Sequence, residues 1–127
     1  MKSKKWILDI EKCIGVDDNI RESYEGWLNG EYVHMVFTEK RIIIVEEPGF
    51  GVQKTKVSLN LPYGRIKKVT LEKPDIIFST GLAFTDYGDF KRVFISETES
   101  AQEIEKKLRL LIQRSVPSLS IIHAPNS

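Results

Sequence analysis

The sequence predicts a mostly β protein in which seven short antiparallel strands form a barrel closed by a C-terminal helix, with a further helix at the N-terminus. Three observations lead to this fold class. β-Branched and aromatic residues gather in short runs between residues 23 and 96, and turn-forming residues separate the runs. Residues 100–114 have the period of an amphipathic helix. The length of 127 residues and the 41% hydrophobic content suit one domain.

The first expected element is a short helix over Lys4–Ile14, which Gly15 would end. Leu8 falls on the polar side of this helix. Asp9 and Glu11 weigh against binding to an anionic membrane, so we expect the helix to dock on the domain's own sheet. The residues on its apolar stripe are Trp6, Ile7, Ile10, Cys13 and Ile14.

The first three strands are expected at Ser23–Leu28, Glu31–Phe37 and Arg41–Glu46, after a charged connector at residues 17–22. Asn29-Gly30 joins the first two strands, and it is a strong signal for a two-residue hairpin turn because both residues tolerate positive φ. A short polar turn at residues 38–40 joins the second strand to the third.

Both faces of the second and third strands are apolar. A sheet that faces water on one side should alternate apolar and polar residues. Here Ile42 and Ile44 lie on one face of the third strand, while Ile43 and Val45 lie on the other. We therefore expect the outer face to be covered by the N-terminal helix, by the C-terminal tail or by a second subunit.

Four more strands complete the predicted sheet. Pro and Gly residues separate them, and Gly81 lies inside one of them, which indicates a bulge or a bend. The expected ranges are Thr55–Asn60, Arg65–Glu72, Asp75–Phe84 and Phe90–Ser96.

The C-terminal helix is expected at Ser100–Arg114 and is the clearest element. Ser100 and Glu103 have the spacing of a capping box. Leu110 lies outside the apolar stripe, which makes it a candidate contact for the tail or for a partner. The residues of the stripe are Ala101, Ile104, Leu108, Leu111 and Ile112.

This order of elements resembles the pleckstrin-homology-like barrel, including GRAM and bacterial pleckstrin-homology-type domains. The segment Gly30–Ile44 looks like the family's hairpin "strand, Leu-Thr-x-x-Arg-hydrophobic, strand", with Phe37 where Leu is usual. Leu61–Val69 is similar to the family's I-x-x-I-x-x-V segment. The resemblance implies a non-catalytic module that binds phosphoinositides, other lipids or proteins. The expected units are an N-terminal helix at 1–16, the barrel domain at 23–114 and a tail at 115–127.

One departure from the family bears on the ligand. Phosphoinositide-binding members place basic residues in the first hairpin loop. The loop Leu28-Asn29-Gly30-Glu31 has no Lys or Arg, so it lacks the charged donors that a phosphate needs. This weighs against inositol phosphate binding at the usual site.

Basic residues elsewhere are candidate ligand-binding residues. Lys54 and Lys56 flank the fourth strand, and Arg65, Lys67 and Lys68 begin the fifth. If those strands pair, the two groups share one edge that could bind an anionic headgroup or an acidic protein surface. The alternative is a set of solvated lysines that protect a sheet edge.

Two apolar residues are also candidates for contact with a ligand or partner. Phe50 lies in a Pro- and Gly-rich loop, where it could insert into a membrane or a partner, or fold back on the domain. Leu110 is the second, for the reason given above.

The composition favours some classes of function over others. The net charge of +1 argues against a general nucleic-acid binder. The single cysteine, Cys13, cannot form an internal disulfide, which favours a cytoplasmic setting. His34 and His123 have no zinc-ligand spacing with other residues, and no nucleophile motif is present. We expect no enzyme activity, no metal and no cofactor.

The sequence favours a protein-interaction or self-association module whose partner is another protein or a second copy of the chain. The alternative is peripheral binding of anionic lipid headgroups at the membrane surface. A small enzyme or ligand carrier is a third hypothesis, which would require a deep polar pocket with a strongly shifted titratable group.

Overall fold

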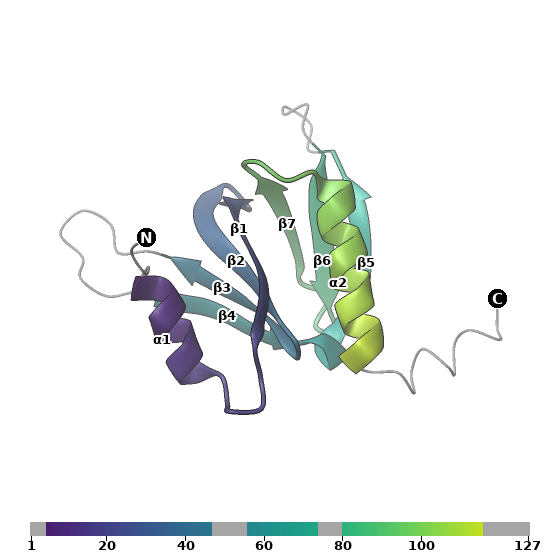
Figure 1. The fold of residues 1–127 in the computed structure, drawn as a ribbon. Helices are drawn as coiled ribbons and strands as arrows, with labels where there is room; N and C mark the ends of the chain where they lie inside the picture. The colour runs from purple at the N-terminus through teal and green to yellow at the C-terminus, as the bar shows by residue number, and fades with distance from the viewer. Residues whose placement is uncertain (1–4, 47–55, 74–79, 116–127) are drawn as a thin grey trace.

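The computed structural model describes residues 5–46, 56–73 and 80–115, and it confirms the mostly β fold class (Figure 1). The candidate residues Phe50 and Lys54, and the predicted tail, lie outside the described residues. The elements in chain order are α1 (Lys5–Cys13), β1 (Ile20–Leu28), β2 (Glu31–Thr38), β3 (Arg41–Glu46), β4 (Lys56–Pro62), the 3₁₀ helix η1 (Tyr63–Arg65), β5 (Ile66–Glu72), β6 (Gly81–Asp86), β7 (Lys91–Ser96) and α2 (Ala101–Ser115).

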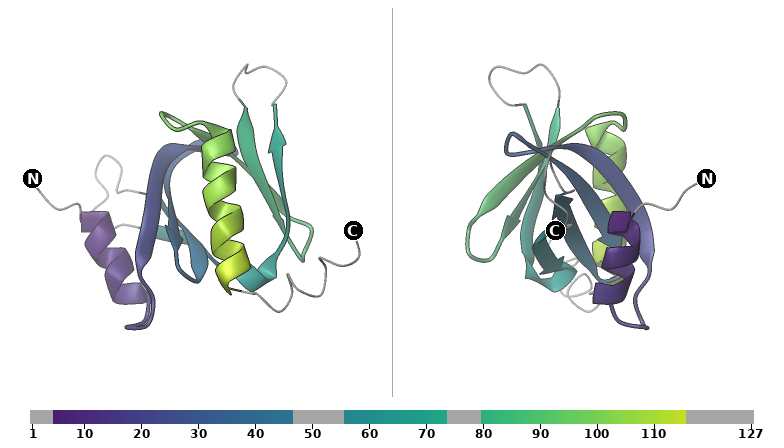
Figure 2. Two further views of the ribbon diagram at one scale, coloured as in Figure 1. Left: turned by 45° about the vertical axis from the view of Figure 1, so that its right-hand side comes forward. Right: turned by 90° about the vertical axis from the view of Figure 1, so that its left-hand side faces the viewer.

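The seven strands form one antiparallel sheet in the order β4-β3-β2-β1-β7-β6-β5. The sheet curls into a half-barrel, and α2 lies across its open side between the β1–β4 half and the β5–β7 half (Figures 1 and 2). β4 and β5 are the two edges of this sheet and do not pair with each other. The chain passes from β4 to β5 through η1. The main core fills the concave side, where the apolar stripe of α2 packs against the inner residues of the strands.

The curl depends on a close approach of two backbones at Gly26. Gly26 lies in the part of β1 that pairs with both neighbouring strands, with Val33 of β2 on one side and Ser96 of β7 on the other. A Cβ atom at residue 26 would lie 2.1 Å from the carbonyl oxygen of Ile95 and 2.9 Å from the Cα of Ser96. Glycine is therefore the residue that lets β7 approach β1 at this point.

α1 covers the outer face of the β2–β3 hairpin. Ile10 and Ile14 pack against Val36, Ile43 and Val45 in a second core, separate from the one under α2. Of the three predicted covers, the N-terminal helix is therefore the one observed. Leu8 faces away from the sheet and is exposed, as expected. Cys13 is also exposed, which differs from its predicted place on the apolar stripe.

Several strand boundaries differ from the predicted ones. β1 begins at Ile20, inside the expected charged connector, because Ile20 pairs with Thr38 and packs against the second core. β6 begins at Gly81 and continues to Asp86. The register shift between β5 and β6 falls between Ile66 and Lys68, so the irregularity lies in β5 and not at Gly81.

α2 begins and packs as the sequence predicts. The backbone N–H of Glu103 donates to the Ser100 hydroxyl at 3.2 Å, which is the N-cap interaction. The residues Ala101, Ile104, Leu108 and Leu111 are buried, and Ile112 packs at the edge of the main core. Within the part of the chain that the structure describes, no helix combines the length and the apolar character needed to cross a membrane.

Candidate binding site

The β2–β3 turn is the point from which the candidate site is built. The hydroxyl oxygen of Thr38 accepts the backbone N–H groups of Lys40 (3.1 Å) and Arg41 (3.0 Å), which closes the turn locally. The same hydroxyl donates to the carboxylate of Asp18 at 2.9 Å. One threonine therefore fixes the turn and attaches it to the connector between α1 and β1.

Asp18 is a fully buried carboxylate with a complete set of donors. Its Oδ2 accepts from Arg41 Nε at 3.1 Å as well as from Thr38. Its Oδ1 accepts the backbone N–H groups of Asn19 (2.8 Å) and Glu39 (3.1 Å). These hydrogen bonds offset the cost of removing the charge from water, so the connector and the turn form one rigid unit.

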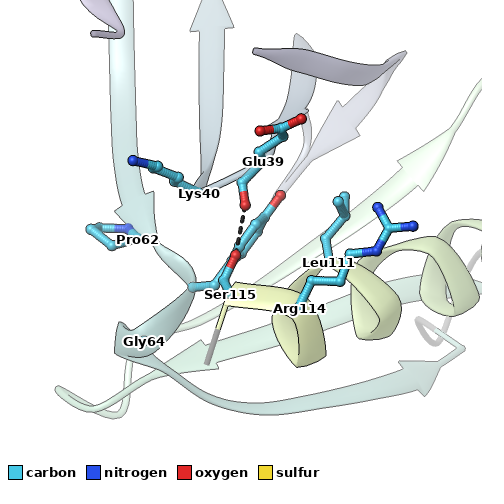
Figure 3. Close-up of a pocket in the computed structure, with 8 residues that line it drawn as sticks. Glu39, Lys40, Pro62, Gly64, Leu111, Arg114 and Ser115 are labelled. Carbon is cyan, nitrogen blue, oxygen red and sulfur yellow. Dashed lines mark hydrogen bonds between the residues drawn. The ribbon is translucent and has the colours of Figure 1, made fainter. Parts of the chain in front are cut away.

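Two more hydroxyl groups attach the turn to the opposite half of the domain. Tyr63 of η1 donates to the carbonyl oxygen of Thr38 at 2.5 Å. Ser115, the last residue of α2, donates to the carbonyl oxygen of Glu39 at 2.6 Å (Figure 3). Burial, followed by the charge of Asp18, raises the pKa of Tyr63, so its hydroxyl remains a donor. The turn, η1 and the end of α2 are thus held together.

A hollow of about 630 Å³ lies between these three elements (Figure 3). Its volume falls within the range of small-ligand sites. Its lining combines apolar and charged side chains, with Arg114 on α2 and Lys40 in the β2–β3 turn. The residues that line it are Glu39, Lys40, Pro62, Tyr63, Gly64, Leu111, Arg114 and Ser115.

A second hollow of about 170 Å³ continues from the first along α2. The two share Leu111 and Arg114, and together we call them the α2 groove. Leu110 lines the second hollow and is 57% exposed. The leucine that the sequence places outside the apolar stripe of α2 therefore faces solvent. The lining of the second hollow is Arg21, Glu22, Lys107, Leu110, Leu111 and Arg114.

The α2 groove carries an excess of positive charge. Its two carboxylates are both paired, Glu39 with Arg21 at 3.3 Å and Glu22 with Lys107 at 3.5 Å. Lys40 bonds to Asp17 outside the groove at 2.7 Å and lowers the pKa of that carboxyl. Within the described ranges, Arg114 has no carboxylate within 4.0 Å.

The predicted basic group does not form one continuous edge. Lys56 begins β4, whereas Lys67 and Lys68 lie on β5, and these strands are opposite edges of the sheet. The condition that the two strands pair is therefore not met. Lys67 is neutralised by Asp89 at 2.6 Å, and this hydrogen bond raises the pKa of Lys67. Arg65 is exposed at the end of η1.

The β6–β7 turn presents two aromatic side chains that the sequence did not single out. Tyr87 is 65% exposed and Phe90 is 55% exposed. The guanidinium of Arg92 lies over the Phe90 ring at 4.3 Å and also pairs with Asp86 at 3.2 Å. The turn is therefore an aromatic tip, and its neighbouring cations Arg92 and Lys67 are paired with Asp86 and Asp89.

Within residues 5–46, 56–73 and 80–115, no three His, Cys, Asp or Glu side chains are grouped so that they could hold a metal ion. His34 is buried on the outer face of β2, with its Nδ1 3.5 Å from Glu25. Its surroundings are those of a packed side chain beside a carboxylate.

Comparisons with known proteins find solved structures with a similar fold. No protein-family model and no curated protein sequence matches the chain. A pleckstrin homology domain from Shewanella amazonensis SB2B superposes with a TM-score of 0.56 and 17% identity, covering 87% of this chain and 95% of that one. A DUF1696 family protein with a pleckstrin-homology domain from Shewanella loihica PV-4 gives a TM-score of 0.63 and 17% identity, covering 88% of this chain and 98% of that one.

Proposed function

We propose that this chain, which has the pleckstrin-homology-like fold, is a non-catalytic protein-binding module whose α2 groove holds a segment of a partner protein. The single observation that carries the proposal is the exposed Leu110 beside two joined hollows. A concave surface lined by apolar side chains and a few charged groups is typical of binding sites.

The chemistry of the groove indicates what kind of segment it binds. Leu110 and Leu111 offer an apolar surface, and next to them lies Arg114, which has no carboxylate within 4.0 Å among the described residues. Arginine binds a carboxylate through two parallel hydrogen bonds, which gives both charge and direction. We infer a segment with an apolar side chain close to an aspartate or a glutamate.

The walls of the α2 groove are held in place by hydrogen bonds, which supports a role of this groove in binding. The hydroxyls of Thr38, Tyr63 and Ser115 hold the turn, η1 and the end of α2 in place. A groove whose walls are already ordered loses little conformational entropy when a segment enters it. The partner can be a different protein or a second copy of the chain.

Photo-crosslinking tests this proposal directly. Leu110 is replaced by p-benzoylphenylalanine in cells of the source organism, and the same residue replaces Gln102, an exposed α2 residue outside the groove, as the matched control. We expect a discrete product from position 110 alone, strongly reduced by Arg114→Glu. Its mass distinguishes a second copy from another protein. Identical products at both positions, or no effect of Arg114→Glu, would contradict the proposal.

A second candidate function, peripheral lipid binding, is favoured by the aromatic tip of the β6–β7 turn. Tyr87 and Phe90 could enter a membrane interface, where aromatic side chains are favoured. Arg65 and Lys68 are exposed cations without a carboxylate within 4.0 Å among the described residues. Each contributes about 1 kcal/mol near an anionic surface, so this electrostatic attraction is weak. For this reason the protein partner is the first proposal.

Vesicle co-sedimentation decides the lipid alternative. The full chain is mixed at low salt with phosphatidylcholine vesicles that do or do not contain phosphatidylserine. Binding to the anionic vesicles that is lost in Phe90→Ser, while Leu8→Ser behaves like the wild type, would support it. Equal recovery in the supernatant with both vesicles would exclude it.

A further inference from the structure

The outer face of the sheet beyond α1 carries an exposed aromatic pair. Trp27 of β1 pairs with Tyr32 of β2 on one side and with Ile95 of β7 on the other. The two rings meet edge to face with centroids 5.3 Å apart. Trp27 is 40% exposed and Tyr32 is 46% exposed. This outer aromatic face, defined by Trp27, Tyr32, Glu25 and Glu97, is distinct from the α2 groove, because α2 packs on the concave side (Figure 2).

The chain covers the neighbouring part of the same surface but leaves this part open. Ile43 and Val45 on the outer face of β3 are buried under α1. Within the described ranges, no helix or strand lies over Trp27 and Tyr32 in the same way. Tryptophan and tyrosine are the residue types most enriched among those that dominate binding energy at interfaces.

Two carboxylates converge on the edge of this aromatic pair. The hydroxyl oxygen of Tyr32 is 2.9 Å from Glu97 Oε1 and 3.2 Å from Glu25 Oε1. A phenol has one proton and donates it to one carboxylate at a time, so the other carboxylate faces a lone pair. Among the described residues, no Lys or Arg nitrogen lies within 4.0 Å of Glu97.

The geometry around Tyr32 also keeps the proton on its phenol. Its hydrogen bond to Glu97, followed by burial and the charge of Glu25, raises the pKa of Tyr32 to about 12. The site thus holds negative charge beside exposed π faces. A cation placed there would be attracted by the carboxylates and by the ring of Trp27.

We propose that the outer aromatic face binds a lysine or arginine side chain from an extended segment of a partner protein. The aliphatic part of that side chain would lie along Trp27, and its charged end would reach Glu97. Charge complementarity selects this occupant, because the same carboxylates repel an anionic membrane and an acidic segment. The proposal is independent of the α2 groove, which requires the opposite charge.

Nuclear magnetic resonance of the ¹⁵N-labelled full chain provides the test. The probe is the peptide acetyl-Gly-Arg-Val-Arg-Gly-amide, and the matched peptide has Gln in place of both Arg residues. We expect the Trp27 indole N–H and the Tyr32 amide to shift saturably with the Arg peptide and not with the Gln peptide. Equal shifts with both peptides, or shifts that do not include Trp27, would overturn the proposal.

Two variants with the same change of net charge separate a site from general attraction. Glu97→Gln removes the carboxylate at Tyr32, while Glu31→Gln alters the opposite face of β2. We expect Glu97→Gln to weaken the Arg peptide about tenfold and Glu31→Gln less than about twofold. Dispersed spectra show that both variants are folded. Equal loss of affinity for the Arg peptide in the two variants would overturn the proposal. If the Trp27 signals shift with protein concentration when no peptide is present, a second copy of the chain occupies this face, and the proposal is overturned.

Discussion

At the scale of single residues, Asp17 and Asp18 are adjacent carboxylates with different surroundings. The side chain of Asp17 is 74% exposed and bonds to Lys40, whereas that of Asp18 is fully buried among Thr38, Arg41 and backbone N–H groups. The sequence shows both residues as part of a charged connector. The period of the sequence cannot reveal the difference, because the side-chain partners of Asp18, Thr38 and Arg41, lie 20 and 23 residues further along the chain.

We predict that Asp18→Asn destabilises the domain by about 3 kcal/mol, because it leaves Arg41 without its carboxylate and turns an amide donor toward other donors. Asp17→Asn is the matched control and should cost less than about 1 kcal/mol, since exposed ion pairs contribute little. Urea unfolding followed by circular dichroism measures both. Similar midpoints for the two variants would show that the buried network does not stabilise the fold.

Among the elements, α1 covers the apolar outer face of the β2–β3 hairpin. The two-sided apolar pattern of residues 32–45 predicted a cover, and the amphipathic period of residues 4–14 predicted a helix that could supply it. The pattern favoured the helix but left the C-terminal tail and a second subunit as alternative covers. Only the placement of Ile10 and Ile14 against Ile43 distinguishes them.

We predict that Ile10→Asp releases α1, because a carboxylate cannot remain unpaired against Ile43 and Val45. The unfolding free energy should fall by about 3 kcal/mol. The variant should also bind a hydrophobic dye and self-associate in sedimentation velocity. Leu8→Asp, on the exposed side of the same helix, should behave like the wild type. Equal dye binding by both variants would mean that α1 does not protect this face.

The helices and strands could be predicted where a local sequence pattern signals them. The parts of the site that depend on tertiary contacts could not be predicted. Periodicity placed α2 and left Leu110 off the stripe, which is where the structure has an exposed leucine in the groove. Tyr63 looked like part of a turn, but it is buried and bonds to Thr38 across twenty-five positions. Likewise, the pairing of Lys67 with Asp89 depends on how β5 lies beside the β6–β7 turn.

At the scale of the whole molecule, acidic pH should weaken the surface ion pairs. Lys40 lowers the pKa of Asp17, Lys91 lowers that of Glu72, and the backbone N–H of Phe90 lowers that of Asp86. A carboxyl whose folded pKa is lowered stabilises the native state above its unfolded pKa. That contribution is lost as the pH falls below the unfolded values of 3.8 and 4.5. Asp17 is exposed, whereas Glu72 and Asp86 are partly buried, so salt should reduce the contribution of Asp17 most.

Three tyrosines affect the stability of the native state at alkaline pH. Burial raises the pKa of Tyr24 and Tyr63, and the hydrogen bond to Glu97 raises that of Tyr32. A raised folded pKa gives a stabilisation that is complete below the unfolded pKa of 10.0 and is lost as the pH rises toward the folded value. We predict a plateau of thermal stability from about pH 5 to 9 that falls on both sides. Tyrosinate absorbance during alkaline titration checks the cause, because the buried Tyr24 and Tyr63 should ionise only as the chain unfolds. Their ionisation with circular dichroism unchanged would contradict the prediction.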